Sequence, residues 1–139
     1  MSSARAIVAG HADFSVGMLS AVRQITGRED VFVALTNRAL SAQGVETAMA
    51  ELLAASGATV IFTDLPAGSC TMAARRLQRG RPELAVVTGT NLAVLLDFLF
   101  ADALVPQEAA QMAAEKGRSS LLVTQARPTS GGGGGTGGD

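Results

Sequence analysis

Residues 6–27 read AIVAGHADFSVGMLSAVRQITG, a short apolar run that leads into a helical pattern. The unbroken run AIVAG (6–10) is typical of a strand buried on both faces of a parallel sheet. After it, apolar residues recur at helical spacing, at Val16, Leu19, Val22 and Ile25. Gly27 closes this pattern as a glycine C-cap. The stretch therefore predicts a strand followed by a helix, with His11, the single histidine of the chain, directly behind the strand.

The same alternation continues along the chain. Apolar runs predict further strands at residues 31–35, 58–63, 84–88 and 120–124. Helical spacing predicts helices over Val45–Gly57, Ser69–Gln78, Asn91–Ala101 and Pro106–Lys116. Strands that alternate with helices favour a parallel sheet with right-handed crossovers. We therefore predict an α/β fold: an open, doubly wound sheet of four parallel strands in the order 2-1-3-4, a short fifth C-terminal strand, and helices on both faces.

Length and composition limit the classes of protein to which the chain can belong. Its 139 residues fit one domain with a single core, which we place at residues 1–126. Residues 127–139, which include the run GGGGGTGGD, have the composition of a flexible tail. The net charge of −1 and the absence of Trp and Tyr argue against a partner that is nucleic acid or an anionic membrane.

The amino-acid content also bears on the cellular location of the protein and on metal binding. Cys70 is the single cysteine, which excludes an internal disulfide and agrees with a reducing compartment. The N-terminal apolar run is too short for a signal peptide, and the apolar stretch at 92–100 is too short to span a bilayer. One histidine and one cysteine cannot build a usual zinc site. We expect a cytoplasmic domain with no cofactor, no metal and no direct membrane insertion.

Ligand sites in open α/β sheets lie outside the carboxyl ends of the strands, where the strand order reverses. Gly10–Asp13, Thr63–Leu65 and Thr88–Asn91 follow three of the predicted strands. In the order 2-1-3-4 the first and third strands are neighbours, so His11 and Asp64 would face each other. The aspartate would fix the imidazole tautomer and leave the other ring nitrogen as a nucleophile. The helix that opens at Ser69 would point its N-terminus, and a hydroxyl, at the same place, which favours an anion such as a phosphoryl group.

Each of these residues also has a purely structural explanation. A histidine that opens a loop is commonly a solvated or capping residue, and Asp64 lies in a segment that resembles an ordinary turn. Ser69 and Asp13 suit helix N-caps, and Cys70 suits a buried apolar position. The arginines that follow, Arg75, Arg76, Arg79 and Arg81, suit a solvated helix face. From the residues alone we predict an α/β domain with a candidate His–Asp anion site, and they do not indicate a particular reaction.

Three segments resemble the mannose-type family of IIA components of the bacterial sugar phosphotransferase system (PTS). They are IVAGHADFSVGMLSAVRQITG (7–27), VIFTDLPAGSCTMAARRL (60–77) and VVTGTNLAVLLDFL (86–99). They stand in the family's order, each at the end of a predicted strand, and the resemblance covers the chain to about residue 124. The segment TGTNLAVLLDF (88–98) is most similar to the N-acetylgalactosamine/galactosamine branch.

The resemblance implies a function and roles for individual residues. His11 stands at the position of the phosphoryl acceptor, Asp64 at that of the carboxylate that orients it, and Ser69 at that of a hydroxyl that bonds the phosphoryl group. Family members accept the phosphoryl group from the histidine of HPr and pass it to a IIB component during sugar uptake. They are cytoplasmic phosphotransferases and are commonly homodimers, and in some the fifth strand, here residues 120–124, is exchanged between subunits.

The sequence departs from the family pattern after the aspartate. A glycine pair, then Ser or Thr and Pro, is usual there, whereas this chain has Ala67-Gly68-Ser69-Cys70. The position after the histidine, often glycine, is Ala12. These changes leave the histidine and its aspartate in place, and they bear on how the phosphoryl group and the partners are bound.

Two other functions stay open. One is a regulatory protein of the same fold whose phosphorylated and unphosphorylated forms bind different partners without serving transport. The other is a thiol enzyme that uses Cys70, with its pKa lowered at a helix N-terminus, and His11 as the base. The thiol hypothesis predicts that Cys70→Ser abolishes function, and the carrier hypothesis predicts that function survives.

Overall fold

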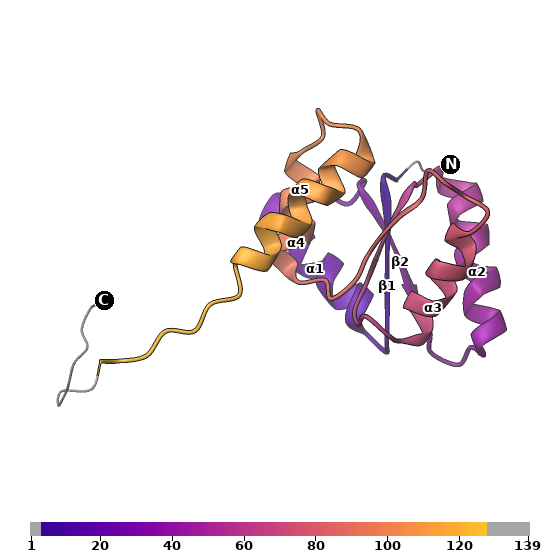
Figure 1. Cartoon of the computed structure of the whole chain (residues 1–139), viewed down its shortest axis with the longest axis horizontal. Coiled ribbons are helices and arrows are strands. Elements are labelled where there is room, and N and C mark those ends of the chain that lie inside the picture. The colour runs from indigo at the N-terminus through magenta and orange to yellow at the C-terminus, as the bar shows by residue number, and fades with distance from the viewer. Residues whose placement is uncertain (1–3, 128–139) are drawn as a thin grey trace.

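The computed structural model describes residues 4–127, in which strands and helices alternate along the chain (Figure 1). The strands are β1 (Ala6–Gly10), β2 (Phe32–Thr36), β3 (Val60–Thr63) and β4 (Ala85–Val87). The helices are α1 (Phe14–Thr26), α2 (Ala42–Ser56), α3 (Ser69–Gln78), α4 (Leu92–Phe100) and α5 (Pro106–Ser119). The predicted helix over residues 69–78 is found with the same bounds, and α5 runs three residues beyond its predicted end at Lys116.

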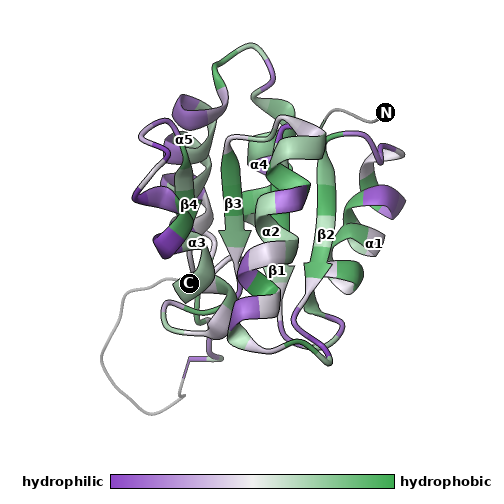
Figure 2. Cartoon of the chain, turned by 90° about the vertical axis from the view of Figure 1, so that its right-hand side faces the viewer, coloured by the Kyte–Doolittle hydropathy of each residue, from purple (hydrophilic) through white to green (hydrophobic). Residues whose placement is uncertain are grey.

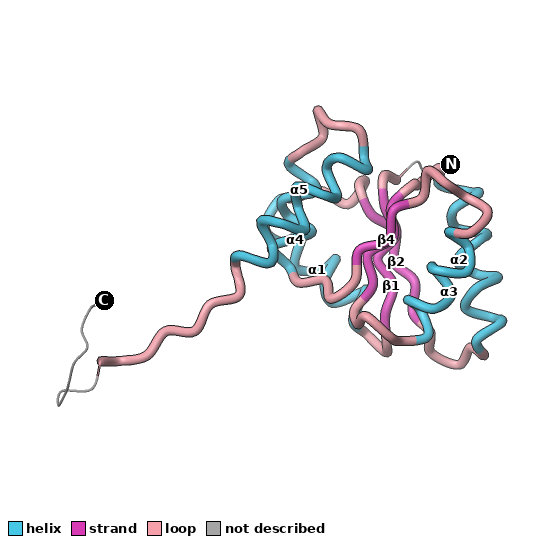
Figure 3. The backbone as a smooth tube through the Cα atoms, in the orientation of Figure 1, coloured by secondary structure: helices cyan, strands magenta, loops and turns pink. Residues whose placement is uncertain are grey.

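The four strands form one parallel sheet in the order β2-β1-β3-β4, as predicted. β1 lies in the middle, where it pairs with β2 through Gly10 and Thr36 and with β3 through Ala9 and Thr63. All five residues of β1 are buried, which explains its unbroken apolar sequence. Helices α2 and α3 cover one face of the sheet, and α1, α4 and α5 cover the other (Figure 3).

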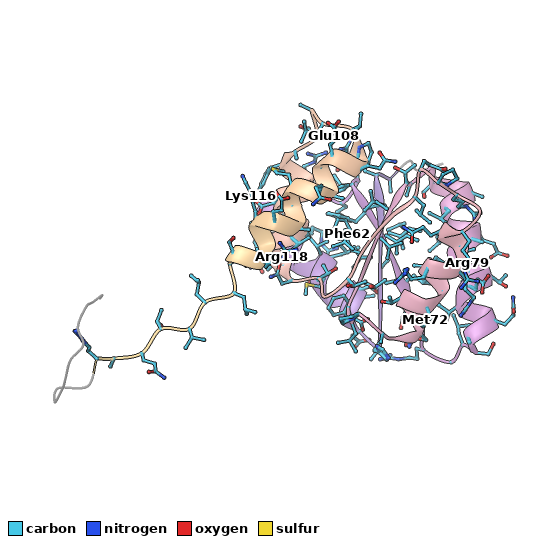
Figure 4. All side chains as sticks on the ribbon, viewed as in Figure 1. Phe62, Met72, Arg79, Glu108, Lys116 and Arg118 are labelled. Carbon is cyan, nitrogen blue, oxygen red and sulfur yellow. The ribbon has the colours of Figure 1, made fainter. Side chains whose placement is uncertain are left out.

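A separate cluster of apolar side chains lies on each face of the sheet. The strands themselves are mostly hydrophobic (Figure 2). On the α4 side the rings of Phe32, Phe62 and Phe98 pack together, with the centroids of Phe62 and Phe98 5.1 Å apart. On the other side Ile61 packs with Met49 of α2 and with α3. Figure 4 shows Phe62 between the two helix layers and Arg79 away from the sheet. The two clusters fix the sheet between the layers and thereby hold the strand ends in place.

The predicted fifth strand at residues 120–124 is not formed. α5 ends at Ser119, and residues 121–127 leave it as a chain without regular secondary structure that extends away from the sheet (Figure 1). A strand needs a neighbouring strand to satisfy its backbone groups, and this arm (residues 121–127) lies apart from both edges of the sheet. Leu121, Leu122 and Val123 are 85%, 76% and 88% exposed. Most of the predicted tail, residues 128–139, lies outside the described residues.

Within residues 4–127 no helix has the length and apolar character needed to cross a membrane.

Helices α4 and α5 pack so closely that the position of Gly117 requires a glycine. Asn91 caps α4 by accepting a hydrogen bond from the Val94 N–H at 2.9 Å, and its Nδ2 donates to the Gly117 carbonyl at 3.0 Å. A Cβ atom on Gly117 would overlap Cγ2 of Val94 and lie 3.2 Å from Oδ1 of Asn91. The contact therefore leaves no room for a side chain.

We expect Gly117→Ala to lower the free energy of unfolding by about 1–3 kcal/mol, the usual cost of overpacking. Gly17→Ala, within α1, is the matched control, because a Cβ there meets nothing within 4 Å. That change should raise stability by about 0.5–1 kcal/mol through helix propensity. Urea unfolding of both variants measures the difference, and equal stability of the two would contradict this account of the α4–α5 contact.

Candidate functional site

His11 and Asp64 meet where β1 and β3 end side by side. The strands are parallel, so their carboxyl ends lie at the same end of the sheet, where the arrowheads of β2 and β3 point in Figure 2. β1 and β3 are hydrogen-bonded neighbours. Nδ1 of His11 lies 2.7 Å from Oδ2 of Asp64, and the backbone N–H of His11 donates to the same oxygen at 2.9 Å. The predicted strand order thus brings together the two residues that the sequence singled out.

The two partners differ in exposure, and this sets the chemistry of the pair. The Asp64 side chain is 9% exposed and that of His11 is 51% exposed. Burial alone would raise the pKa of Asp64, but the hydrogen bonds from the ring and the backbone N–H of His11 outweigh it and lower this pKa. The ionised carboxylate is only an acceptor, so a neutral His11 ring carries its proton on Nδ1. Nε2 is then left with its lone pair, as a nucleophile needs.

Two glycines allow the backbone to approach this pair closely. A Cβ on Gly10 would lie 2.6 Å from Cδ2 of Phe14 and 2.9 Å from Oδ2 of Asp64. A Cβ on Gly68 would lie 3.0 Å from Cε1 of His11. The imidazole therefore lies against the backbone of Gly68, the glycine that this chain keeps from the usual pair. Ala67, which replaces the other glycine, lies one residue further from α3.

The N-terminus of α3 is part of the same cluster. Gly68 occupies the N-cap position and Ser69 the first helical position, so Ser69 is not the N-cap. The first N–H groups of a helix have no acceptor within it and carry the positive end of the helix dipole. The helix begins directly after Gly68, whose backbone lies against Cε1 of the His11 ring. The arrangement can accommodate an anionic group near Nε2.

A third segment, which follows β2, reaches the site and was not singled out from the sequence. Nδ2 of Asn37 donates to Oγ of Ser69 at 2.9 Å. Oγ1 of Thr36 donates to the carbonyl of Ala12 at 2.7 Å, and Ala12 has a left-handed φ of 48°. Arg38 forms an ion pair of 3.0 Å with Asp13. The signal was available, because β2 borders β1 and its carboxyl end must lie at the same edge of the sheet.

The remaining candidates lie outside the His11–Asp64 pair. Asp13 occupies the N-cap position of α1, but its side chain makes no capping hydrogen bond. In the segment after β4, the Thr90 N–H donates to the Thr63 carbonyl at 3.1 Å, and Asn91 caps α4. Of the arginines, Arg76 donates to Glu46 of α2 at 2.6 Å. None of these contacts involves His11 or Asp64.

Cys70 is fully buried in the apolar cluster beneath α2 and α3. Burial, together with the nearby charge of Asp64, raises the pKa of its thiol to about 11. A nucleophilic cysteine needs the opposite shift. Among residues 4–127 there is also no group of three or more His, Cys, Asp or Glu side chains that could hold a metal ion.

The amino-acid sequence matches the model of a known protein family. Residues 5–115 match the family EIIA-man, described as the PTS system fructose IIA component. No curated protein matches the chain significantly.

Solved structures share the fold at low sequence identity. The PTS component EIIA from Streptococcus agalactiae has a TM-score of 0.77 at 17% identity, covering 86% of this chain and 95% of that one. The mannose/sorbose-specific IIA subunit from Enterococcus faecalis has a TM-score of 0.76 at 21% identity, covering 91% and 98%. A sigma-54 interaction domain protein from Enterococcus faecalis has a TM-score of 0.70 at 13% identity, covering 86% and 93%. At such identities the likeness is one of fold.

Proposed function

The chain belongs to the EIIA-man family of PTS IIA components, and on that premise we propose that it is a cytoplasmic phosphoryl carrier of sugar transport. It accepts the phosphoryl group of phospho-HPr on His11 and passes it to a IIB component. The observation that carries this proposal is the His11–Asp64 pair, which leaves Nε2 of a half-exposed ring free. A half-exposed nucleophile suits a carrier, because both the donor and the acceptor must reach it.

The proposed chemistry needs little beyond positioning. Nε2 of His11 attacks phosphorus, a new P–N bond forms, and the P–N bond to the histidine of HPr breaks, with its electron pair returning to that ring. One phosphohistidine replaces another, so the exchange is close to balanced. Asp64 holds the attacking ring in position, and the N-terminus of α3 with the Ser69 hydroxyl stabilises the charge on the phosphoryl oxygens.

The arm offers a second element of the proposal. Leu121, Leu122 and Val123 form an exposed apolar run that one copy of the chain does not cover. In a homodimer this run would pair, as an exchanged fifth strand, with the sheet of a second subunit. The segment 88–98 suggests the N-acetylgalactosamine/galactosamine branch. Within this segment Asn91 joins α4 to α5, through hydrogen bonds that involve neither His11 nor Asp64. The identity of the sugar is therefore a question for transport or transfer assays.

Phosphorylation by the complete donor system tests the proposed function. The purified chain is incubated with Enzyme I, HPr and phosphoenolpyruvate, and its intact mass is followed. We expect a gain of one phosphoryl group that is labile in acid and stable in base, the behaviour of a phosphohistidine. No gain with a cognate HPr, or an acid-stable product, would overturn the proposal.

A regulatory role remains the second candidate, since the fold is shared with the sigma-54 interaction domain protein. Transfer onward separates the two hypotheses. A transport carrier loses its phosphoryl group to a IIB protein, whereas a regulator keeps it and changes its binding partners.

The thiol hypothesis makes a separate prediction. We expect Cys70→Ala to accept the phosphoryl group within about threefold of the wild-type rate, because a thiol with a pKa of about 11 is ionised to only ~0.01% at pH 7. Alanine is preferred to serine here, since serine would bury a hydroxyl. The rate of phosphoryl uptake from phospho-HPr is the measurement. Loss of uptake in a variant that still folds would reinstate Cys70 as a functional residue.

A further inference from the structure

Asn37 connects three of the segments that build the site. Its backbone N–H donates to the carbonyl of Gly10 at 3.2 Å, directly before His11. Its carbonyl accepts from the Leu40 N–H at 3.1 Å, which closes the turn after β2. Its side chain crosses to the N-terminus of α3, where Nδ2 donates to Oγ of Ser69 at 2.9 Å. The backbone therefore anchors the residue, and the amide is directed at Ser69.

The direction of that last hydrogen bond has a chemical consequence. The amide nitrogen can only donate, so it occupies one lone pair of the Ser69 hydroxyl and leaves the hydroxyl proton for another acceptor. Ser69 follows Gly68, whose backbone lies against Cε1 of His11. An anionic group on Nε2, which is bonded to Cε1 and is not engaged by Asp64, is the acceptor that this arrangement would serve.

We propose that Asn37 is a positioning residue for phosphoryl transfer, acting through Ser69. Its amide fixes the rotamer of Ser69 and turns the hydroxyl proton toward the phosphoryl group on Nε2 of His11. This inference rests on the proposed function, because it needs a phosphoryl group at that atom. It adds a residue that the motifs in residues 60–77 do not contain.

A purely structural role for the Asn37 side chain makes different predictions. The two backbone hydrogen bonds of Asn37 do not depend on its side chain, so Asn37→Ala keeps the turn after β2. Asn37→Asp also keeps a link to α3, because a carboxylate accepts a hydrogen bond from the Ser69 hydroxyl. The direction of the hydrogen bond is then reversed, and the Ser69 hydroxyl proton points to the introduced carboxylate rather than to the phosphoryl group. A purely structural connection to α3 survives this change, whereas the positioning role does not.

A double-mutant cycle with a small-molecule donor tests the proposal. Phosphoramidate transfers its phosphoryl group without any protein partner: Nε2 of His11 bonds phosphorus, the P–N bond of the donor breaks, and ammonia leaves. The rate of phosphohistidine formation is measured by intact mass for the wild type, Asn37→Ala, Asn37→Asp, Ser69→Ala and Asn37→Ala/Ser69→Ala. Urea unfolding of each variant confirms that it is folded.

We expect Asn37→Ala to slow phosphorylation ~10-fold, the effect of one hydrogen bond to a charged group. Asn37→Asp should be slower still, and the double variant should match Ser69→Ala alone, because the effect of Asn37 passes through Ser69. Equal slowing by Asn37→Ala in both backgrounds, no slowing at all, or a wild-type rate for Asn37→Asp would overturn the inference. Reaction with phosphoramidate but not with phospho-HPr would refute the proposed function. The phosphoramidate rates would still show whether Asn37 acts through Ser69. Failure of His11 to react with either donor would overturn both.

Discussion

Replacing His11 by alanine is expected to abolish phosphoryl uptake from phospho-HPr. The chain contains no other histidine, and Nε2 of His11, which the hydrogen bond to Asp64 leaves free, is the nucleophile that we propose. The variant should show no acid-labile mass gain under conditions in which the wild type is fully phosphorylated. Intact mass spectrometry after incubation with Enzyme I, HPr and phosphoenolpyruvate measures this directly.

The loss should not come from unfolding. The His11 side chain is half exposed and lies outside both apolar clusters. Removing it takes one of two hydrogen bonds from the buried Asp64 carboxylate, which should lower the free energy of unfolding by about 1–3 kcal/mol. Urea unfolding of the variant confirms that it is folded when its phosphoryl uptake is measured. A phosphorylated His11→Ala variant would mean that another side chain accepts the group, and the carrier mechanism would have to be abandoned.

Asp64→Asn is expected to slow phosphoryl uptake by about 10²- to 10⁴-fold without removing the nucleophile. Asparagine has nearly the same shape, and the backbone N–H of His11 favours its amide oxygen at the position of Oδ2, so the hydrogen bond to Nδ1 is kept. The negative charge that holds the proton on Nδ1 and supports a positively charged ring is lost. The comparable change in a Ser-His-Asp triad costs about 10⁴-fold in rate.

A matched carboxylate isolates this effect. Asp13 lies close to His11 in sequence, but it is exposed and paired with Arg38, so Asp13→Asn should leave the rate within about twofold. Rapid-quench kinetics with phospho-HPr compare the two variants, and ¹⁵N chemical shifts of the His11 ring report which nitrogen holds the proton. A near-normal rate for Asp64→Asn would show that the carboxylate does not orient the ring.

Much of the fold was predictable because buried parallel strands have an unmistakable composition. The run AIVAG (6–10) is typical of a central strand, which has both faces covered, and all five of its residues are buried in the sheet. Once that strand is central and its neighbours are β2 and β3, the residues behind β1 and β3 have to be adjacent. The strand order thus places His11 and Asp64 side by side, within reach of the hydrogen bond that joins them.

Other features of the site could not be predicted from the pattern. The strand order places the segment Thr36-Asn37-Arg38 at the edge where the site lies, but its turn-like composition does not indicate that Asn37 reaches across to Ser69. The close approach of His11 to Gly68 depends on side-chain positions that periodicity does not describe. The apolar run at residues 120–124 was predicted to be a strand because apolar patterning indicates what a segment needs to bury, but not whether its own chain provides the partner.

The uncovered arm also has a consequence for handling the protein. Three consecutive apolar side chains in water, on a chain whose parallel sheet has open edges at β2 and β4, form a combination that promotes aggregation. Any preparation in which this run stays uncovered should lose colloidal stability as its concentration rises. The storage buffer and the working concentration therefore matter as much for this chain as the integrity of its core.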